Sequence, residues 1–238
     1  MNDCKDMECI TIEETSVVNR LEDVGSKTKI IYVTDPMCSW CYGISPVLEG
    51  LQNYCHEHNI ALEVVVGGLR SGGKGTWTPE FKGFLKETWT RISKVTGLPF
   101  SDDLLSHEYF NYDTTPSCDA IVLAKELLSK ENKQNIIPFL IELQRKFYQE
   151  GQDPKEAQFY QSVCEKTGVD YEAFKSLFNN PKIRSLTKSE FEWCRQVGVS
   201  GFPSFLLIYD SKVHLLASGY TSLEKILKRL TALESLAV

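Results

Sequence analysis

Two short apolar runs near the start of the chain have the length and composition of buried strands. The first lies within KTKIIYVTDP (27–36) and ends at a proline, and the second lies within IALEVVVGGLR (60–70) and ends in glycines. Both are rich in β-branched residues, which favour extended backbone. The pattern therefore predicts two strands with little polar alternation, as expected when both faces of a sheet are covered.

A helical pattern separates these two strands. The stretch CSWCYGISPVLEGLQNYCHEH (38–58) carries apolar residues at helical spacing, and Pro46 lies inside it. A proline in this position should kink the helix about two turns after its start. A strand, a helix and a second strand within about forty residues predict a βαβ unit with parallel strands and a right-handed crossover.

From about residue 76 to residue 180, the periodicity indicates helices alone. One helix is expected to begin at a threonine cap followed by Pro79 and to end at Gly97. Further helical patterns begin at TTPSC, at IIPF and at DPKE (153–156), and glycines end the last two, at Gly151 and Gly168. A final short pattern, DYEAFKSLFNN, ends before a proline.

The C-terminal part returns to a mixture of helices and strands. We expect a helix over 181–199, a strand over 201–209, a turn at DSKV, a returning strand over 214–220 and an amphipathic helix over 222–236.

This order predicts an α/β fold interrupted by a large helical insertion. Residues 29–75 and 181–238 are expected to form one α/β domain, residues 76–180 an inserted helical domain, and residues 1–28 a polar N-terminal lead.

Composition and charge exclude several kinds of partner. The chain has 238 residues, of which 42% are hydrophobic and 24% charged, as in an ordinary globular protein. Its net charge is −6 and it has no lysine- and arginine-rich run, so we expect neither nucleic acid nor a membrane as a partner. The polar, acidic N-terminus does not resemble a signal peptide, and no apolar run has the length of a membrane span, so we expect a cytoplasmic protein.

The eight cysteines are scattered along the chain apart from one pair. Cys38 and Cys41 are separated by two residues in DPMCSWCYG (35–43). In a chain of this size and in a reducing cytoplasm, we expect most of the others to remain thiols. Cys55, Cys164 and Cys194 fall within predicted helices, where a free cysteine packs as a small hydrophobic residue.

Several interpretations of the CxxC pair compete. A structural zinc site needs four ligands, and the sequence has neither a second CxxC nor a histidine pair at suitable spacing. Haem attachment requires a histidine directly after the second cysteine, where Tyr42 stands. A chance pair of buried thiols and a redox-active dithiol stay open.

The position of the pair favours the redox interpretation. Cys38 falls where a predicted strand gives way to a helix, and a helix N-terminus stabilises a thiolate through its free N–H groups and partial positive charge. Cys41 lies about one helical turn further along and can close onto Cys38.

The chain resembles the DsbA-like branch of the thioredoxin superfamily over residues 29–238. The resemblance rests on DPMCSWCYGISP, GGLR, FYQEG and GFPSFLL, and it is greatest to predicted cytoplasmic protein-disulfide isomerases related to FrnE. It implies a thioredoxin fold with a large all-helical insertion. It also implies a thiol–disulfide oxidoreductase or isomerase that acts on protein or peptide thiols and disulfides, with glutathione as a further candidate partner, and that needs no cofactor or metal.

The resemblance also implies roles for individual residues. Cys38 matches the nucleophilic cysteine and Cys41 the resolving one, while Pro203 matches the cis-proline that faces them. The backbone of Phe202 would pair with an extended substrate, and Ser39 and Trp40 would tune the dithiol and form substrate-binding surface.

The sequence departs from the family pattern at two places. The superfamily often carries a buried acid six residues before the nucleophile, but Tyr32 stands there, and Asp35 should lie at the end of the strand. No histidine adjoins Cys38, because the dipeptide between the cysteines is Ser-Trp. We therefore expect a weaker oxidant than DsbA.

Two other functions stay open. One is a DsbA-like adaptor or redox sensor that binds partners without turnover. The other is a glutathione-dependent transferase or isomerase of the kappa-like group, although these enzymes carry serine where this chain has Cys38. The stretch GLRSGGKGT (68–76) nearly matches a phosphate-binding loop, but it lacks the Ser or Thr that should follow Lys74. Cys118 is a separate case, and we expect it to be a packing thiol rather than a third redox group.

Overall fold

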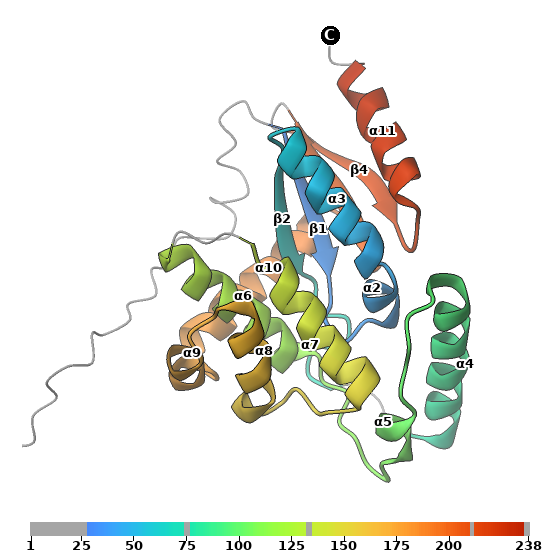
Figure 1. Cartoon of the computed structure of the whole chain (residues 1–238), viewed down its shortest axis with the longest axis vertical. Helices are drawn as coiled ribbons and strands as arrows, with labels where there is room; N and C mark the ends of the chain where they lie inside the picture. The colour runs from blue at the N-terminus through green and yellow to red at the C-terminus, as the bar shows by residue number, and fades with distance from the viewer. Residues whose placement is uncertain (1–27, 74–76, 132–134, 210–211, 236–238) are drawn as a thin grey trace, which may run out of the picture.

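A four-stranded sheet forms the core of the computed structural model, which describes residues 28–73, 77–131, 135–209 and 212–235 (Figure 1). The strand order is β2-β1-β3-β4, in which β1 is parallel to β2 and antiparallel to β3, and β3 is antiparallel to β4. The strands are β1 (Lys29–Thr34), β2 (Ala61–Val66), β3 (Ser204–Tyr209) and β4 (Lys212–Ser218). The parallel pairing of β1 and β2 confirms the predicted βαβ unit.

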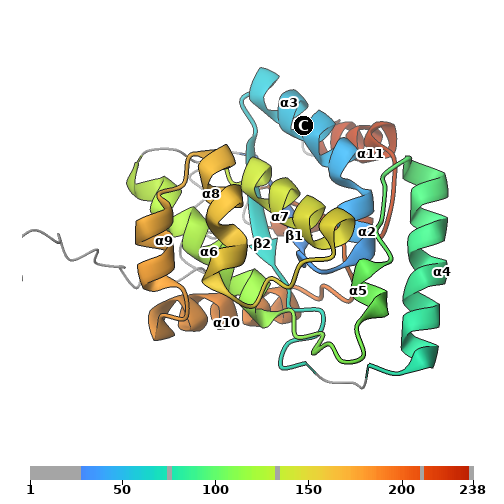
Figure 2. The ribbon, with the colours of Figure 1, turned by 60° about the horizontal axis from the view of Figure 1, so that its bottom comes forward.

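Strand β1 lies inside the sheet, and all six of its residues are buried. Helices cover both faces of the sheet: α3 (Ser45–Glu57) and α11 (Leu223–Ser235) lie on one side, and α10 (Pro181–Gln196) lies on the other (Figure 2). Because both faces of β1 are covered by helices, its residues 30–33 are all apolar instead of alternating with polar ones.

The first helical segment is divided into α2 (Ser39–Gly43) and α3 (Ser45–Glu57). The break falls at Ile44, two residues before Pro46, because the proline occupies the first turn of α3, where its missing N–H costs no hydrogen bond. The expected interruption is therefore present, but it comes earlier than a kink at the proline itself. A short α2 results, with the CxxC pair at its start.

Helices alone occupy the described part of the predicted insertion. They are α4 (Pro79–Thr96), α5 (Asp103–Ser106), α6 (Thr115–Lys130), α7 (Ile137–Glu150), the 3-10 turn η1 (Ala157–Tyr160), α8 (Gln161–Thr167) and α9 (Tyr171–Leu177). Thr78 caps α4 by accepting from the Phe81 N–H, and left-handed glycines end three of these helices as expected, at Gly97, Gly151 and Gly168.

Several predicted boundaries were wrong. The helix expected over 181–199 ends at Gln196, and the strand expected over 201–209 starts at Ser204. The helix expected from Asp153 starts only at Ala157, because residues 151–156 form a loop in which the Pro154 carbonyl accepts a hydrogen bond from the Tyr160 hydroxyl at 2.7 Å. Strand β4 begins at Lys212 rather than at residue 214.

The element order confirms an α/β thioredoxin fold carrying a helical insertion. The expected polar lead lies almost wholly outside the described residues. Within the described ranges, no helix is both long and apolar enough to cross a membrane.

Candidate active site

The CxxC pair lies at the N-terminus of α2. Cys38 is the N-cap residue, with extended backbone, and its carbonyl accepts the N–H groups of Cys41 at 2.9 Å and Tyr42 at 3.1 Å. The Cys38 N–H in turn donates to the Asp35 carbonyl at 3.0 Å, which closes a tight turn between β1 and α2. Both cysteines are thiols, and Cys38 is 6% exposed whereas Cys41 is 1% exposed. The more exposed cysteine of the pair is thus the one at the helix N-terminus.

Phe202 and Pro203, which are far from the CxxC pair in the sequence, lie close to it in the structure. The Phe202–Pro203 peptide bond is cis, and the Cys38 Sγ lies 3.7 Å from the Phe202 carbonyl oxygen. The Pro203 carbonyl accepts the Gly219 N–H at 2.8 Å, which ties this segment to the end of β4. The structure therefore brings together the loop after β1 and the residues before β3.

A glycine makes room for the Phe202 side chain. A Cβ atom added at Gly67, directly after β2, would lie 2.0 Å from the Phe202 ring. The Gly67 N–H donates to the Thr34 carbonyl at 2.8 Å, so the backbone at this point is held against β1. The ring can lie here only because residue 67 has no side chain.

The two residues between the cysteines have different environments. Ser39 is buried, and its Oγ accepts the indole N–H of Trp89 at 2.8 Å, which ties α2 to α4. Trp40 is half-buried, with the Tyr220 ring centroid at 5.5 Å and the Arg91 guanidinium over its ring at 5.5 Å. Trp40 thus contributes to the surface beside Cys38, whereas Ser39 points into the protein.

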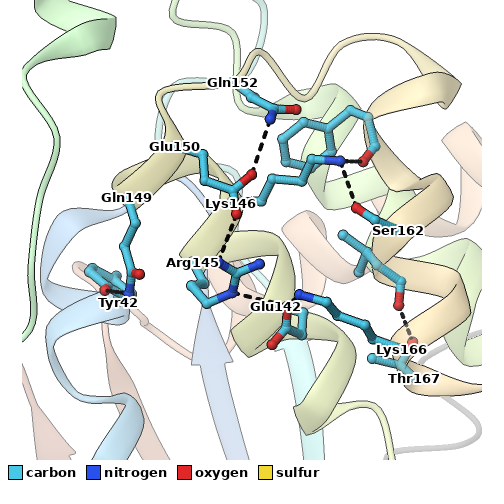
Figure 3. A network of polar contacts seen from close by, with 12 residues as sticks. Tyr42, Glu142, Arg145, Lys146, Gln149, Glu150, Gln152, Ser162, Lys166 and Thr167 are labelled. Atoms are coloured by element: carbon cyan, nitrogen blue, oxygen red, sulfur yellow. Dashed lines mark hydrogen bonds and ion pairs between the residues drawn. The ribbon is translucent and has the colours of Figure 1, made fainter.

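Tyr42 fixes α2 to the helical insertion. Its hydroxyl donates to the Pro99 carbonyl at 3.2 Å. The same hydroxyl accepts from the Gln149 side-chain amide at 2.7 Å (Figure 3). Its ring stacks on Tyr148 at a centroid distance of 4.9 Å. Gln149 and Tyr148 both lie on α7, so the α2 helix is anchored on that helix as well as on α4.

Asp35 lies buried behind the CxxC turn. One carboxylate oxygen accepts the Met37 N–H at 2.9 Å and the other accepts the Leu69 N–H at 2.6 Å. The Cys118 thiol also lies 3.7 Å from Asp35, and both residues are fully buried. Burial raises the pKa of Asp35 to about 6, partly offset by these hydrogen bonds. The full burial of Cys118 agrees with a packing thiol.

The buried Cys41 thiol lies over β1. Burial raises its pKa well above the usual range, and the neighbouring Cys38 thiol raises it further, whereas the Thr34 hydroxyl and the Asp35 backbone N–H lower it through hydrogen bonds. Sequence reasoning missed Thr34. The alternation of a strand shows only that residues 32 and 34 share a face, and the packing of α2 decides that Cys41 lies over that face.

Other candidate sites find little support. No group of three or more His, Cys, Asp or Glu side chains suited to a metal ion occurs among the described residues. In the glycine-rich loop, the Gly72 N–H donates to the carboxylate of Asp113 at 2.9 Å. Because the Asp113 carboxylate already accepts this N–H group, the group is not free to bind a phosphate, and the contact does not favour a phosphate-binding loop.

Comparison with known families identifies part of the chain. The model of the DsbA-like thioredoxin domain matches residues 127–231. This match runs from α6 into α11 and includes Pro203 but not the CxxC pair.

Solved structures extend the likeness to most of the chain. A protein from Nitrosomonas europaea proposed to be a protein disulfide isomerase is 26% identical, with a TM-score of 0.78 over 88% of this chain and 98% of that one. The cytosolic disulfide reductase DsbM from Pseudomonas aeruginosa is 24% identical, with a TM-score of 0.68 over 88% and 98% of the two chains. DsbM has also been solved with GSH, at a TM-score of 0.67 and 23% identity over 88% of this chain and all of that one.

A curated relative carries a different description. The ClpXP adapter protein SpxH from Shouchella clausii is 20% identical over 182 residues, which cover 74% of this chain. The match spans only 56% of the length of that relative.

Proposed function

The chain carries a DsbA-like thioredoxin domain, and from this premise we propose that it is a thiol–disulfide oxidoreductase or isomerase acting through Cys38 and Cys41. The observation that carries the proposal is the position of the Cys38 sulfur at the N-terminus of α2, 3.7 Å from the carbonyl of the residue before Pro203. A thiolate formed there gains the helix N-terminus as an electrostatic partner, and the facing backbone can hold a substrate segment.

The proposed reaction has two exchange steps. In the first, the Cys38 thiolate attacks a substrate disulfide, so that a mixed disulfide forms and one substrate sulfur leaves as a thiolate. In the second, the Cys41 sulfur attacks the Cys38 sulfur, which breaks the mixed disulfide and leaves the Cys38–Cys41 bond. The substrate gains two electrons and the dithiol loses two, and in the oxidising direction the same steps run backwards.

The surroundings of Cys38 favour an extended peptide as substrate. We assign the backbone of Phe202 to pairing with that peptide, because its carbonyl faces the Cys38 sulfur. We assign the half-buried Trp40 ring to an apolar contact with residues that flank the substrate sulfur. Glutathione is a further candidate substrate because DsbM, which shares the fold, has been solved with GSH. The cytoplasm is the proposed location, in line with the sequence and with the cytosolic description of DsbM.

A second candidate function is a binding adaptor without turnover. The likeness to a ClpXP adapter protein supports it, although that likeness covers only 56% of the relative's length. In that case the surface beside Cys38 would hold a partner chain, and exchange chemistry would not be required for delivery.

Insulin reduction by the full-length protein distinguishes the two functions. Cys38→Ser should abolish the activity, whereas Cys4→Ser and Cys9→Ser, the same chemical change in the polar lead, should leave it unchanged. Cys41→Ser should retain the first exchange step and accumulate mixed disulfides, whose partners can be identified by mass spectrometry. A Cys38→Ser variant that retains full activity would overturn the proposal. If the wild type has no activity and Cys41→Ser traps no partner, while Cys38→Ser still binds one, the protein is an adaptor.

A further inference from the structure

Three side chains from separate parts of the fold meet beside the CxxC pair. Trp40 lies on α2 between the two cysteines, Arg91 lies on α4, and Tyr220 follows β4. The Trp40 ring has the Tyr220 ring centroid at 5.5 Å, and the Arg91 guanidinium lies over it, also 5.5 Å from its centroid. We call these two aromatic rings and one cation the Arg91 cluster.

The packing of α4 against α2 holds Arg91 in its place. Two residues before it, the indole N–H of Trp89 donates to the buried Ser39 Oγ at 2.8 Å. One residue after it, the Ile92 side chain would lie 2.7 Å from a Cβ atom added at Gly43, so the two helices approach closely at this glycine. Figure 2 shows the two helices side by side. Because these contacts lie on both sides of Arg91 along α4, its backbone is fixed relative to α2.

The segment around Pro203 places Tyr220 next to the CxxC pair. The Gly219 N–H donates to the Pro203 carbonyl at 2.8 Å, and Tyr220 is the next residue, with 39% of its surface exposed. On the other side of Pro203, the Phe202 carbonyl oxygen lies 3.7 Å from the Cys38 sulfur. The Arg91 cluster therefore adjoins the place where, under the proposed function, an extended substrate would reach Cys38.

Arg91 carries a positive charge that the protein does not neutralise with a carboxylate. The residue is exposed, and within the described ranges no ion pair joins it to an acidic side chain, although Glu87 lies one turn earlier on α4. Lys86 on the same helix differs, because it pairs with Asp102 at 2.7 Å. A guanidinium that stacks on a ring keeps its N–H edge available, and this edge can bind a carboxylate through two hydrogen bonds.

The surface around Arg91 is hollowed and positively charged. A hollow of about 630 Å³ lies on α4 and is lined by Lys86, Glu87, Thr90, Arg91, Lys94 and Val95. Three of these six residues carry a positive charge and one a negative charge, in a protein whose net charge is −6. This surface therefore attracts an anionic group more than the protein as a whole does.

We propose that Arg91 is a specificity-determining residue that binds a carboxylate of the substrate, so that the protein prefers disulfides with an aspartate or glutamate next to the cysteine. The inference rests on the proposed function, because it names the class of peptide that the same site takes. Apolar atoms of the substrate would lie against Trp40 and Tyr220. The dithiol still passes two electrons to the substrate disulfide in the two exchange steps described above, and Arg91 keeps its charge and protons throughout.

Single-turnover reduction of small peptide disulfides tests the assignment. The substrates are disulfide-linked dimers of the blocked tripeptides Asp-Cys-Ala and Ala-Cys-Asp, each compared with a twin in which asparagine replaces aspartate. Asparagine has the shape of aspartate without its charge. The parent protein is the reduced full-length chain with Cys4→Ser and Cys9→Ser, and the peptide thiol that it releases at low ionic strength is measured by chromatography after an acid quench. Oxidised glutathione is a further substrate.

The parent protein should reduce the aspartate dimer of at least one order about fivefold faster than its asparagine twin, as for a well-placed exposed ion pair. Arg91→Gln should abolish this preference. Arg195→Gln removes another exposed arginine, on α10 at the other face of the sheet, and should keep the full preference. All of these proteins should react with the neutral disulfide dithiodipyridine within about twofold of each other, because Cys38 itself is unchanged.

Three other results overturn the assignment. Equal rates for both aspartate dimers and their twins in the parent protein, or a preference that survives Arg91→Gln, show that Arg91 does not bind the substrate. A preference that Arg195→Gln also abolishes shows an effect of net charge alone. If the reduction of oxidised glutathione depends on Arg91 and that of neither aspartate dimer does, the surface recognises a small molecule and not an acidic peptide.

Failure of the proposed function gives a different result. In that case the parent protein would reduce no peptide disulfide and would react with dithiodipyridine no faster than Cys38→Ser does. Both proposals would then be overturned together. Normal reduction of every dimer without a preference for aspartate overturns only the role of Arg91.

Discussion

The Sγ atom of Cys38 and the carbonyl oxygen of Phe202 lie 3.7 Å apart although 164 positions separate them in the sequence. This contact joins the N-terminus of α2 to the segment that leads into β3. Under the proposed function, it is the place where a substrate segment would meet Cys38, and neighbouring residues such as Gly67 keep the two atoms in position.

Gly67→Ala should disturb this contact. The added Cβ would lie 2.0 Å from the Phe202 ring, so the ring must move and shift the Phe202 backbone relative to Cys38. We expect a loss of about 1–3 kcal/mol in the free energy of unfolding, typical of overpacking, together with a clear loss of insulin reduction. Urea denaturation and the activity assay measure the two effects. Gly83→Ala on α4, where an added Cβ meets nothing within 4 Å, is the control and should not be destabilising. Equal behaviour of the two variants would contradict the prediction.

Ser39→Ala should destabilise the protein without impairing exchange. The change leaves the buried indole N–H of Trp89 without its acceptor, which costs about 1–3 kcal/mol of stability. In a Trp89→Phe background, which has no such donor, the same change should be nearly neutral. A double-mutant cycle by urea denaturation measures the difference. A large fall in kcat/KM with unchanged stability would instead indicate that Ser39 contacts the substrate, as expected from the sequence.

Trp40→Ala should weaken the binding of protein substrates. The half-buried ring lies beside Cys38 and packs against Tyr220 and Arg91, so its removal takes away apolar surface next to the CxxC pair. We expect the KM for insulin to rise roughly fivefold, the size of one aromatic contact, with little change in the rate of the reaction with dithiodipyridine. Phe84→Ala is the matched control, since Phe84 is an aromatic residue 59% exposed on α4. A KM that changes equally in both variants would argue against a specific surface.

Asp35 should make stability depend on pH. Its pKa is raised from 3.8 to about 6 in the folded protein, so the native state binds this proton more tightly than the unfolded chain. Its contribution therefore favours folding below about pH 4 and is lost as the pH rises through about 6, by roughly 3 kcal/mol in total. Urea denaturation of the wild type and of Asp35→Asn between pH 4 and 7 measures this contribution of Asp35 to the free energy of unfolding. The wild type should lose stability relative to the variant over that range, and a difference that does not vary with pH would refute the assignment.

Local patterns in the sequence were sufficient for most of the fold. The β-branched run at 30–34 could be interpreted as a strand because a central strand needs apolar residues on both faces. Glycines after helical patterns, such as Gly97 and Gly151, marked helix ends because only glycine takes the left-handed conformation there without cost. The helix break was placed at Pro46 rather than at Ile44 because a pattern does not show whether a proline starts a new helix or bends an existing one.

The sequence by itself determined the candidate dithiol, its position at a strand-to-helix junction and the order of the elements, since all of these depend on neighbouring residues. Only the tertiary structure decided which distant groups surround the dithiol. Phe202 reaches Cys38 because β3 pairs with β1, Ser39 turns inward because Trp89 on α4 offers it a donor, and Thr34 lies beneath Cys41 because α2 folds back over β1. Such contacts depend on how whole elements pack, and no local spacing of residues carries that information.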